Sequence, residues 1–273
     1  MRGFWLLLSA VLLPFGCGGS PGTAGTAPSP APMRPEGPPQ ASPAKELGVL
    51  DFPASFATVD GSIQDDSRLE GLVAPFRARM VQEIQQVIGE AAGIFSKAVP
   101  EGTLGNFAAD AMLWAANSHL PAPAHMALTN NGGLRVPIGS GPITTGQMYE
   151  LMPFENMLSV LVLTGSQVQE LCNELAEKRG EPIAGFSFHI GFENDHRVAR
   201  DIMVQGQPLE REEEYRLVTT DYLANGGESL STLQSPVARE DLSILLRDAF
   251  IGYIRHLGVI EPKMEGRITG GIG

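Results

Sequence analysis

The amino-acid sequence predicts a single domain of the α/β class, built in layers around an α+β-like mixed sheet. In several segments apolar residues recur at spacings of three and four, which is the pattern of amphipathic helices. Short runs with β-branched or alternating character, bounded by Gly or Pro, lie between those segments. Because helical and strand patterns interleave and some strands are joined by hairpin turns, parallel and antiparallel pairs are both expected.

The first 17 residues have the architecture of a signal peptide. Arg2 is followed by an apolar run of about a dozen residues and then by small residues. Gly16 before Cys17 resembles the cleavage site of a bacterial lipoprotein, so Cys17 is the predicted lipidation site. Pro14 and Phe15 depart from that pattern, and a plain secreted protein is the alternative. The expected location is therefore the bacterial cell envelope, through a lipid anchor at the outer membrane, periplasm or cell surface.

Residues 18–46 are rich in Gly, Pro, Ala and Ser and contain little that can be buried. This composition predicts a disordered tether that would hold a folded domain away from a membrane. The folded domain is expected to cover residues 47–273.

The first helix of that domain is predicted from an apolar stripe comprising Leu69, Leu72, Val73, Phe76, Met80, Ile84, Val87 and Ile88. A second helix is predicted over 104–119, directly after Thr103. It is apolar on most of its circumference, so it should be central and buried.

Strands are predicted at 126–129, 159–165, 185–190 and 198–204. The segment 204–209 has the character of a hairpin turn and is expected to join the strand before it to another at 214–220.

Two further helices complete the predicted fold. Ser166 and Gln169 form a capping-box pattern for a helix over 166–178, and Gly180 would end that helix. Its apolar face includes Cys172, which is therefore interpreted as a buried small hydrophobic residue and not as a nucleophile. The last helix is predicted from apolar residues between Leu242 and Ile254, with its end near Gly258.

Composition and motifs exclude several functional classes. The formal net charge of −12 argues against nucleic-acid binding, which requires clustered Lys and Arg. The chain contains no P-loop, no G-x-S-x-G nucleophile elbow and no G-x-G-x-x-G that opens a helix. Its five His residues are scattered, and no pair has the spacing of a helical metal site. The residues alone therefore predict no catalytic group and no metal ligand.

One stretch, ALTNNGGLRVPIGSGPITTGQMYELMPFEN at 127–156, combines residue types that suit a ligand. Asn130 can donate and accept hydrogen bonds, and Gly132 and Gly133 permit a positive φ and a close approach of a ligand to the backbone. Arg135 offers a planar fork for phosphate or carboxylate. Phe154 offers a flat apolar face, and Asn156 can bond the edge of a group stacked there.

A second stretch, DYLANGGES at 221–229, repeats this combination with aromatic Tyr222 and acidic Glu228. Two aromatic rings, an acid, amides and one arginine suit a nucleoside that carries a phosphate, because a base stacks between rings and an acid accepts ribose hydroxyls. Two glycine turns beside core aromatics are the alternative that these residues leave open.

Several blocks occur in one order and spacing that resembles the C-terminal domain of the 5′-nucleotidase family: TLGNFAADAM, the stretch at 127–156, LVLTGSQVQELC and YRLVTTDYLANGGES. The resemblance covers about 64–262. It implies a layered α/β fold that binds a nucleotide.

The resemblance also implies roles for individual residues. Phe154 and Tyr222 would sandwich the base, and Asn156 would contact its edge. Glu228 would bind the ribose in place of the usual Asp. Asn130 and Arg135 would correspond to the asparagine and the arginine of the family's NGGxR-type block.

Two departures from the family pattern limit this assignment. The family carries two divalent metals in an N-terminal metallophosphoesterase domain, with D-x-H, G-N-H-[DE] and G-H-x-H blocks, and none of these blocks occurs here. Family members also place arginine just before the LGN block, where this chain has Pro100 and, nearby, only Lys97.

Three functions are compatible with this pattern. The first is a nucleotide- or nucleoside-binding module linked to extracytoplasmic nucleotide catabolism, without cofactor of its own. The second is an enzyme in its own right, or half of a split hydrolase that is completed by a separate metallophosphoesterase chain. The third is a structural or interaction lipoprotein that has lost its ligand.

Overall fold

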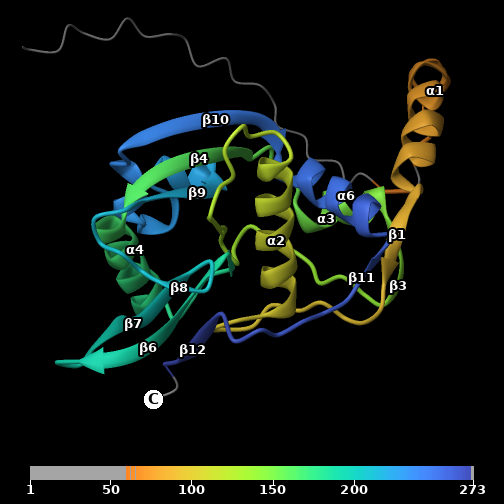
Figure 1. The fold of residues 1–273 in the computed structure, drawn as a ribbon. Coiled ribbons are helices and arrows are strands. Elements are labelled where there is room, and N and C mark those ends of the chain that lie inside the picture. The colour runs from red at the N-terminus through yellow and green to blue at the C-terminus, as the bar shows by residue number, and fades with distance from the viewer. Residues whose placement is uncertain (1–59, 62, 65, 272–273) are drawn as a thin grey trace, which may run out of the picture. The chain divides into compact units, whose positions relative to one another are not determined.

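The computed structural model describes residues 60, 61, 63, 64 and 66–271 (Figure 1). The predicted signal peptide, the lipidation at Cys17, the tether at 18–46 and the domain start at 47 lie outside the described residues. The chain divides at 62/63, and every described helix and strand belongs to the second part, Ile63–Gly273.

A five-stranded sheet organises this part of the chain, in the order β10–β4–β9–β2–β5. Strands β2 and β9 run parallel, and the other neighbours are antiparallel. The bounds are Met126–Leu128 for β2, Met157–Thr164 for β4, Ile183–Ala184 for β5, Glu214–Thr220 for β9 and Ala238–Leu245 for β10. Both faces of the sheet are covered, because alternate side chains enter two different clusters. Val160 and Val218 join one cluster, whereas Leu161 and Leu217 join the other.

Helices and a small sheet cover the first face. The helices are α2 (Thr103–Asn117), α3 (Thr145–Leu151) and α6 (Leu246–Leu257), and the small sheet, β11–β1–β3, comprises Val259–Ile260, Val87–Ala91 and Gly141–Thr144. Figure 1 shows α2 in the middle of this arrangement. As predicted, α2 is buried on most of its circumference.

The second face is covered by α4 (Gly165–Glu177) and by a four-stranded sheet, β12–β6–β7–β8. Those strands are Ile268–Gly270, Phe186–Glu193, His196–Val204 and Gln207–Pro208. Cys172 is fully buried in α4, and burial raises the pKa of its thiol far above the usual range. The prediction that Cys172 is a buried hydrophobic residue is confirmed. The short helix α5 (Asp221–Ala224) and two 3₁₀ turns, η1 (Gly227–Ser229) and η2 (Ser231–Gln234), follow β9.

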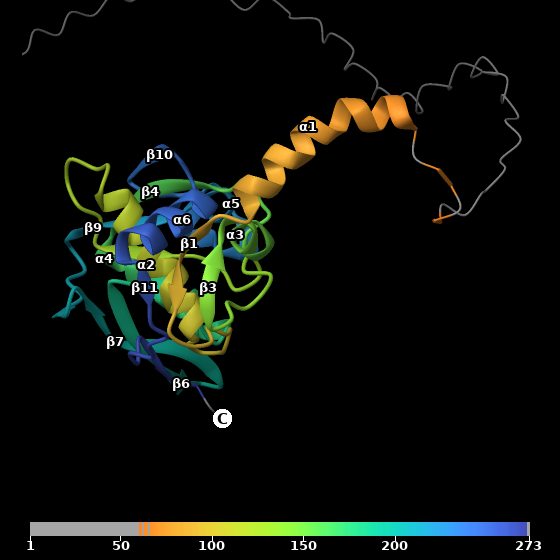
Figure 2. The same ribbon diagram turned by 90° about the vertical axis from the view of Figure 1, so that its right-hand side faces the viewer.

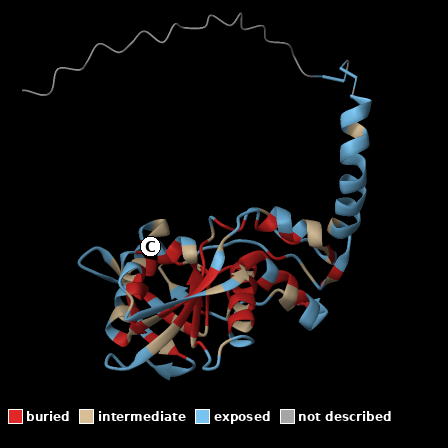
Figure 3. Cartoon of the chain, turned by 90° about the horizontal axis from the view of Figure 1, so that it is seen from above, coloured by how far each residue is buried: buried red, intermediate tan, exposed pale blue. Residues whose placement is uncertain are grey.

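Helix α1 (Ser67–Ile84) differs from the prediction in two ways (Figures 2 and 3). It ends at Ile84, so Val87 and Ile88 belong to β1. None of its residues is buried, and Leu72 and Phe76 are 68% and 76% exposed. Periodicity identified the apolar face of this helix but not whether anything covers it. None of the described helices is both long and apolar enough to cross a membrane.

Three other predicted boundaries were wrong. The capping box of α4 is formed by Thr164 and Gln167, two residues before the predicted pair. The last helix begins at Leu246, because Leu242 lies in β10. The predicted hairpin turn is present at Gln205 and Gly206, but it joins β7 to β8, while β9 pairs with β4 and β2 in another sheet. The described residues therefore form three mixed sheets where the sequence predicted one.

His125 helps to hold β2 beside β9. Its backbone N–H donates to the carbonyl of Arg216 at 2.9 Å, and its Nδ1 accepts from the backbone N–H of Arg216 at 3.0 Å. Desolvation, followed by the nearby Arg216 charge, lowers the pKa of His125 below its usual 6.5. The folded state thus binds a proton at His125 less readily than the unfolded chain.

This pKa shift predicts a pH dependence of stability. The contribution of His125 is fully present above pH 6.5 and is lost as pH falls from there through the lowered folded-state pKa. Acidification from about pH 7.5 to about pH 5.5 should lower the melting temperature more in the wild type than in His125→Asn, which keeps an acceptor but does not titrate. Calorimetric melting at both pH values measures this, and equal shifts would contradict the assignment.

Candidate functional site

The pairing of three strands brings distant loops to one edge of the five-stranded sheet. Strands β2 and β9 are parallel, with Met126 opposite Leu217, so their carboxyl ends meet there. Strand β4 is antiparallel to β9, with Leu158 opposite Thr220, so its amino end lies at the same edge. The segments after β2, before β4 and after β9 therefore converge.

These segments enclose a cavity of about 350 Å³. The residues that line it are Asn130, Gly132, Gly133, Arg135, Phe154, Asn156, Tyr222 and Glu228. All seven residues that the sequence predicted as ligand contacts are thus brought together. Their role in binding stays a prediction.

The two aromatic side chains of the cavity are half-exposed, Phe154 to 44% and Tyr222 to 45%. They are therefore not core aromatics. The ring of Tyr222 lies directly against Gly227, where an added Cβ would come 2.5 Å from Cε1 of the ring. Any side chain at this position would displace the tyrosine ring.

Asn130 and Glu228 form a hydrogen-bonded pair in the lining of the cavity. Asn130 is 4% exposed, and its Nδ2 donates to Oε1 of Glu228 at 2.9 Å. Nζ of Lys178 lies 3.9 Å from the other carboxylate oxygen. Glu228 has a left-handed φ of 57° and lies two residues after Gly226, whose φ is 94°. The backbone is bent there so that the carboxylate meets Asn130.

The glycines of the NNGG turn do not serve the predicted positive φ, while the close approach of a ligand to their backbone stays a prediction. Neither Gly132 nor Gly133 has a positive φ. An added Cβ on Gly132 would instead lie 3.1 Å from the Asn130 amide nitrogen and 3.3 Å from Glu228, and one on Gly133 would lie 3.2 Å from Met152. These glycines permit close packing around the Asn130–Glu228 pair.

Arg135 is the only cation that lines the cavity among the described residues. Its Nη1 donates to the carbonyl of Gly132 at 3.1 Å, and its Cζ lies 5.9 Å from the ring centre of Phe154. Pro100 lines a different hollow. Lys97 turns its ammonium to the loop, donating to the carbonyls of Leu134 at 2.9 Å and Asn131 at 3.3 Å.

Two residues outside the cavity fix the position of the NNGG turn, and sequence reasoning did not assign either to it. Lys97 binds the turn through the carbonyls of Asn131 and Leu134, and Glu181 accepts from the backbone N–H of Asn131 at 2.7 Å and from its Nδ2 at 3.1 Å. Burial raises the pKa of Glu181. Lys97 and Glu181 lie 34 and 50 residues from Asn131, so no local pattern signals these contacts.

Asp221 connects the two aromatic segments. Its Oδ1 accepts from the backbone N–H of Met157 at 3.1 Å and from that of Tyr222 at 2.8 Å. The start of β4, which follows Phe154, is thereby tied to the start of α5, which carries Tyr222. This bond maintains the spacing of the segments that bear the rings.

Comparison with known proteins identifies the fold and its relatives. The profile of the family described as "5′-nucleotidase, C-terminal domain" matches residues 87–235. A trifunctional nucleotide phosphoesterase of Bacillus subtilis is 33% identical over 182 residues, which is 62% of this chain and 12% of that protein. A cell wall protein of Listeria monocytogenes is 29% identical over 217 residues, covering 67% of this chain and 27% of the relative.

A crystal structure gives the same result. The 5′-nucleotidase precursor of Thermus thermophilus superimposes with a TM-score of 0.65 and 28% identity, over 77% of this chain and 44% of that one. The chain thus spans less than half the length of each of these three relatives.

Proposed function

The chain belongs to the 5′-nucleotidase C-terminal domain family, and we propose that its cavity binds the nucleoside part of a nucleotide. The observation that carries this proposal is the convergence of two half-exposed aromatic rings and the Asn130–Glu228 pair around one cavity of about 350 Å³.

Each part of a nucleoside has a matching group in the cavity. The base stacks between Phe154 and Tyr222, where one stacking contact is worth about 1–3 kcal/mol. The side chain of Asn156 faces the base edge. The ribose hydroxyls donate to Glu228, whose carboxylate is held by Asn130 and Lys178.

The charges of the cavity favour the nucleoside over the phosphate. Arg135 and Glu228 are the only charged residues that line it within the described part of the chain, so their formal charges cancel. Arg135 already donates one hydrogen bond to the Gly132 carbonyl, and Lys97 is engaged with the loop. A phosphate thus meets a single, solvent-exposed guanidinium, and an exposed ion pair of this kind is worth about 1 kcal/mol or less.

The proposed cellular location is outside the cytoplasm. The sequence features of residues 1–17 support it, as do relatives that include a cell wall protein and a 5′-nucleotidase precursor. Lipid attachment at Cys17 is the proposed mode of anchoring.

A second function, half of a split nucleotidase, is favoured by α1. Its exposed apolar stripe directly precedes the region matched by the family profile, which starts at Val87. The relatives are more than twice as long as the parts that match. A separate metallophosphoesterase chain that packs on α1 would supply the metals that activate water for phosphate hydrolysis.

The nucleoside proposal predicts that the full chain binds adenosine and AMP with affinities within about tenfold of each other in isothermal titration calorimetry. A Phe154→Ala/Tyr222→Ala variant should bind adenosine at least about thirtyfold more weakly, because it loses two stacking contacts. Phe192→Ala removes an equally exposed aromatic residue on β6 and should bind normally. Absence of heat with either ligand, or equal binding by the double variant, would refute the proposal.

The split-enzyme proposal predicts that the full chain alone releases no phosphate from AMP, even with added Mn²⁺. Addition of a lone metallophosphoesterase from the same genome should start release. Leu72→Glu/Phe76→Glu should abolish that effect by placing charge in the apolar stripe, whereas Phe192→Glu should not. Metal-dependent release of phosphate by the chain alone would contradict the split-enzyme proposal, because no partner on α1 would then be needed.

Anchoring at Cys17 predicts that the wild-type chain sediments with membranes and that Cys17→Ser appears in the soluble fraction. Immunoblots of both fractions measure this. A wild-type chain that is soluble would favour the secreted alternative.

A further inference from the structure

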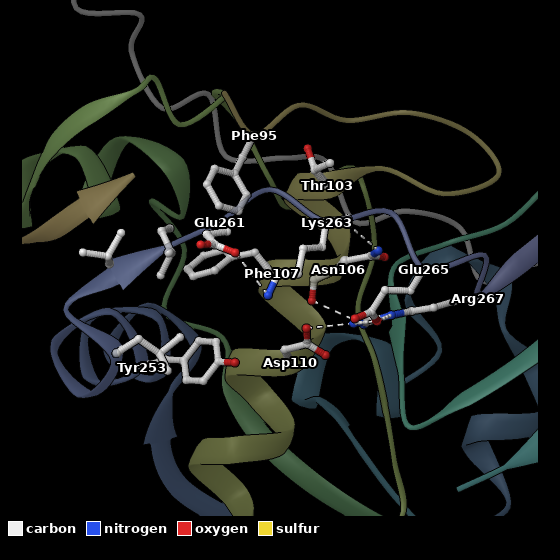
Figure 4. A pocket seen from close by; sticks show the side chains of 13 residues that line it. Phe95, Thr103, Asn106, Phe107, Asp110, Tyr253, Glu261, Lys263, Glu265 and Arg267 are labelled. Carbon is white, nitrogen blue, oxygen red and sulfur yellow. Dashed lines mark hydrogen bonds and ion pairs between the residues drawn. The ribbon is translucent and has the colours of Figure 1, made fainter. Parts of the chain in front are cut away.

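A second cavity, of about 390 Å³, lies between α2, α6 and the segment 259–267 (Figure 4). It shares no lining residue with the nucleoside cavity. Phe107, Tyr253, Leu257 and Ile260 give it an apolar wall, and Asp110 lies at its polar end. Asp110 also lines two shallower hollows beside it, so three hollows meet at this carboxylate.

The buried Arg267 has no donor nitrogen left for a ligand. Its Nη2 donates to Asp110 Oδ2 at 2.8 Å and to Glu265 at 2.6 Å, and its Nη1 donates to the carbonyl of Ile183 at 2.7 Å. Its Nε also donates to Glu265 at 2.9 Å. Two carboxylates therefore more than balance the guanidinium charge. Among the described residues that line the cavity, the one other cation for an anionic ligand is Lys263, which pairs with Glu261 at 3.3 Å.

Two polar atoms at the end of the cavity are unused within the part of the chain that the structure describes. Among the described residues, none donates a hydrogen bond to Oδ1 of Asp110, and Arg267 donates to the other oxygen, Oδ2. The hydroxyl of Tyr253 is directed toward Asp110 in Figure 4, and no described residue forms a hydrogen bond with it. Desolvation and the nearby Asp110 charge raise the pKa of Tyr253, which agrees with the proximity of the two groups. A ligand with several hydrogen-bond donors would satisfy both atoms.

Two aromatic rings pack beside Tyr253, that of Phe107 in this cavity and that of Trp114 in one of the neighbouring hollows. The ring centres of Phe107 and Tyr253 are 6.1 Å apart, and those of Trp114 and Tyr253 are 5.5 Å apart. Ring faces attract cations, and they do so more strongly where water is partly excluded. The charged lining residues are Asp110, Glu261, Glu265, Lys263 and Arg267, whose formal sum is −1.

We propose that this cavity binds an organic cation, a primary amine with an apolar or aromatic body. The ammonium donates to Asp110 Oδ1 and to the Tyr253 hydroxyl, and the body packs against Phe107 and Leu257. A primary ammonium fits because it has three donors and no acceptor. The net charge of −12 on the chain adds a long-range attraction for a cation.

The test is a calorimetric titration of the full chain with phenethylammonium chloride and with 2-phenylethanol, its neutral counterpart of similar shape. We expect the amine to bind at least about tenfold more tightly, with saturation below about 10 mM. Equal binding of the two compounds, or no binding of the amine, would overturn the proposal.

Variants locate the binding site. Tyr253→Phe keeps the ring and should weaken amine binding about threefold to tenfold through loss of one hydrogen bond. Asp110→Asn should weaken it further. Melting curves show whether this variant still folds, because it lacks the negative charge that pairs with Arg267. Glu193→Gln, which removes an exposed carboxylate on β6, should bind as the wild type does.

Phe154→Ala/Tyr222→Ala separates the two cavities, because it should leave amine binding unchanged. Loss of amine binding in that double variant would place the amine in the nucleoside cavity and overturn the proposal. Amine binding that is unchanged both in Tyr253→Phe and in a folded Asp110→Asn would overturn it as well. If Asp110→Asn does not fold, Tyr253→Phe and the neutral compound decide the outcome.

Discussion

The pairing of β4 with β9, and of β9 with β2, is the constraint on which the candidate nucleoside site depends. This pairing places two carboxyl ends and one amino end at a single edge of the sheet, and the three loops at that edge carry every residue that lines the cavity. The sheet is able to hold them in place because both of its faces are buried, one by α2 and α6 and the other by α4 and the second sheet. A shift of one residue in the register of β9 would turn Val218 to the wrong cluster and move Tyr222 away from Phe154.

The exposed groups of the cavity are few, and neighbouring groups, most of them buried or partly buried, position them. Asn130 orients Glu228, Lys97 and Glu181 fix the turn that carries Gly132, and Asp221 ties the two aromatic segments together. Such a preorganised cavity loses little conformational entropy when a rigid ligand enters. Its chemistry is that of recognition. Stacking, hydrogen bonding and one guanidinium account for how a nucleoside is held, and the split-enzyme proposal assigns the hydrolytic groups to a second chain.

The parts of the structure that depend on local pattern were predictable from the sequence. The segment 214–220 is the strand β9, and the apolar circumference of 104–119 correctly indicated a buried helix. The seven cavity residues were identified because each chemical type stands in a short, unusual stretch. The remainder depends on tertiary contacts. Lys97 and Glu181 act on a turn far away in the sequence, and strands of two or three residues such as β5, β11 and β12 have no periodicity to detect. For α4, Thr164–Gln167 and Ser166–Gln169 both fit a capping box, and only the fold distinguishes them. The apolar stripe of α1 could be predicted from the sequence, but its exposure to solvent could not.

The central claim is that the space between Phe154 and Tyr222 holds the base of a nucleoside. A crystal structure of the full chain soaked with adenosine tests it most directly. We expect difference density for the base between the two rings, with the ribose hydroxyls within hydrogen-bonding distance of Glu228. Adenosine bound elsewhere on the chain, or an empty cavity at a saturating concentration, would contradict it.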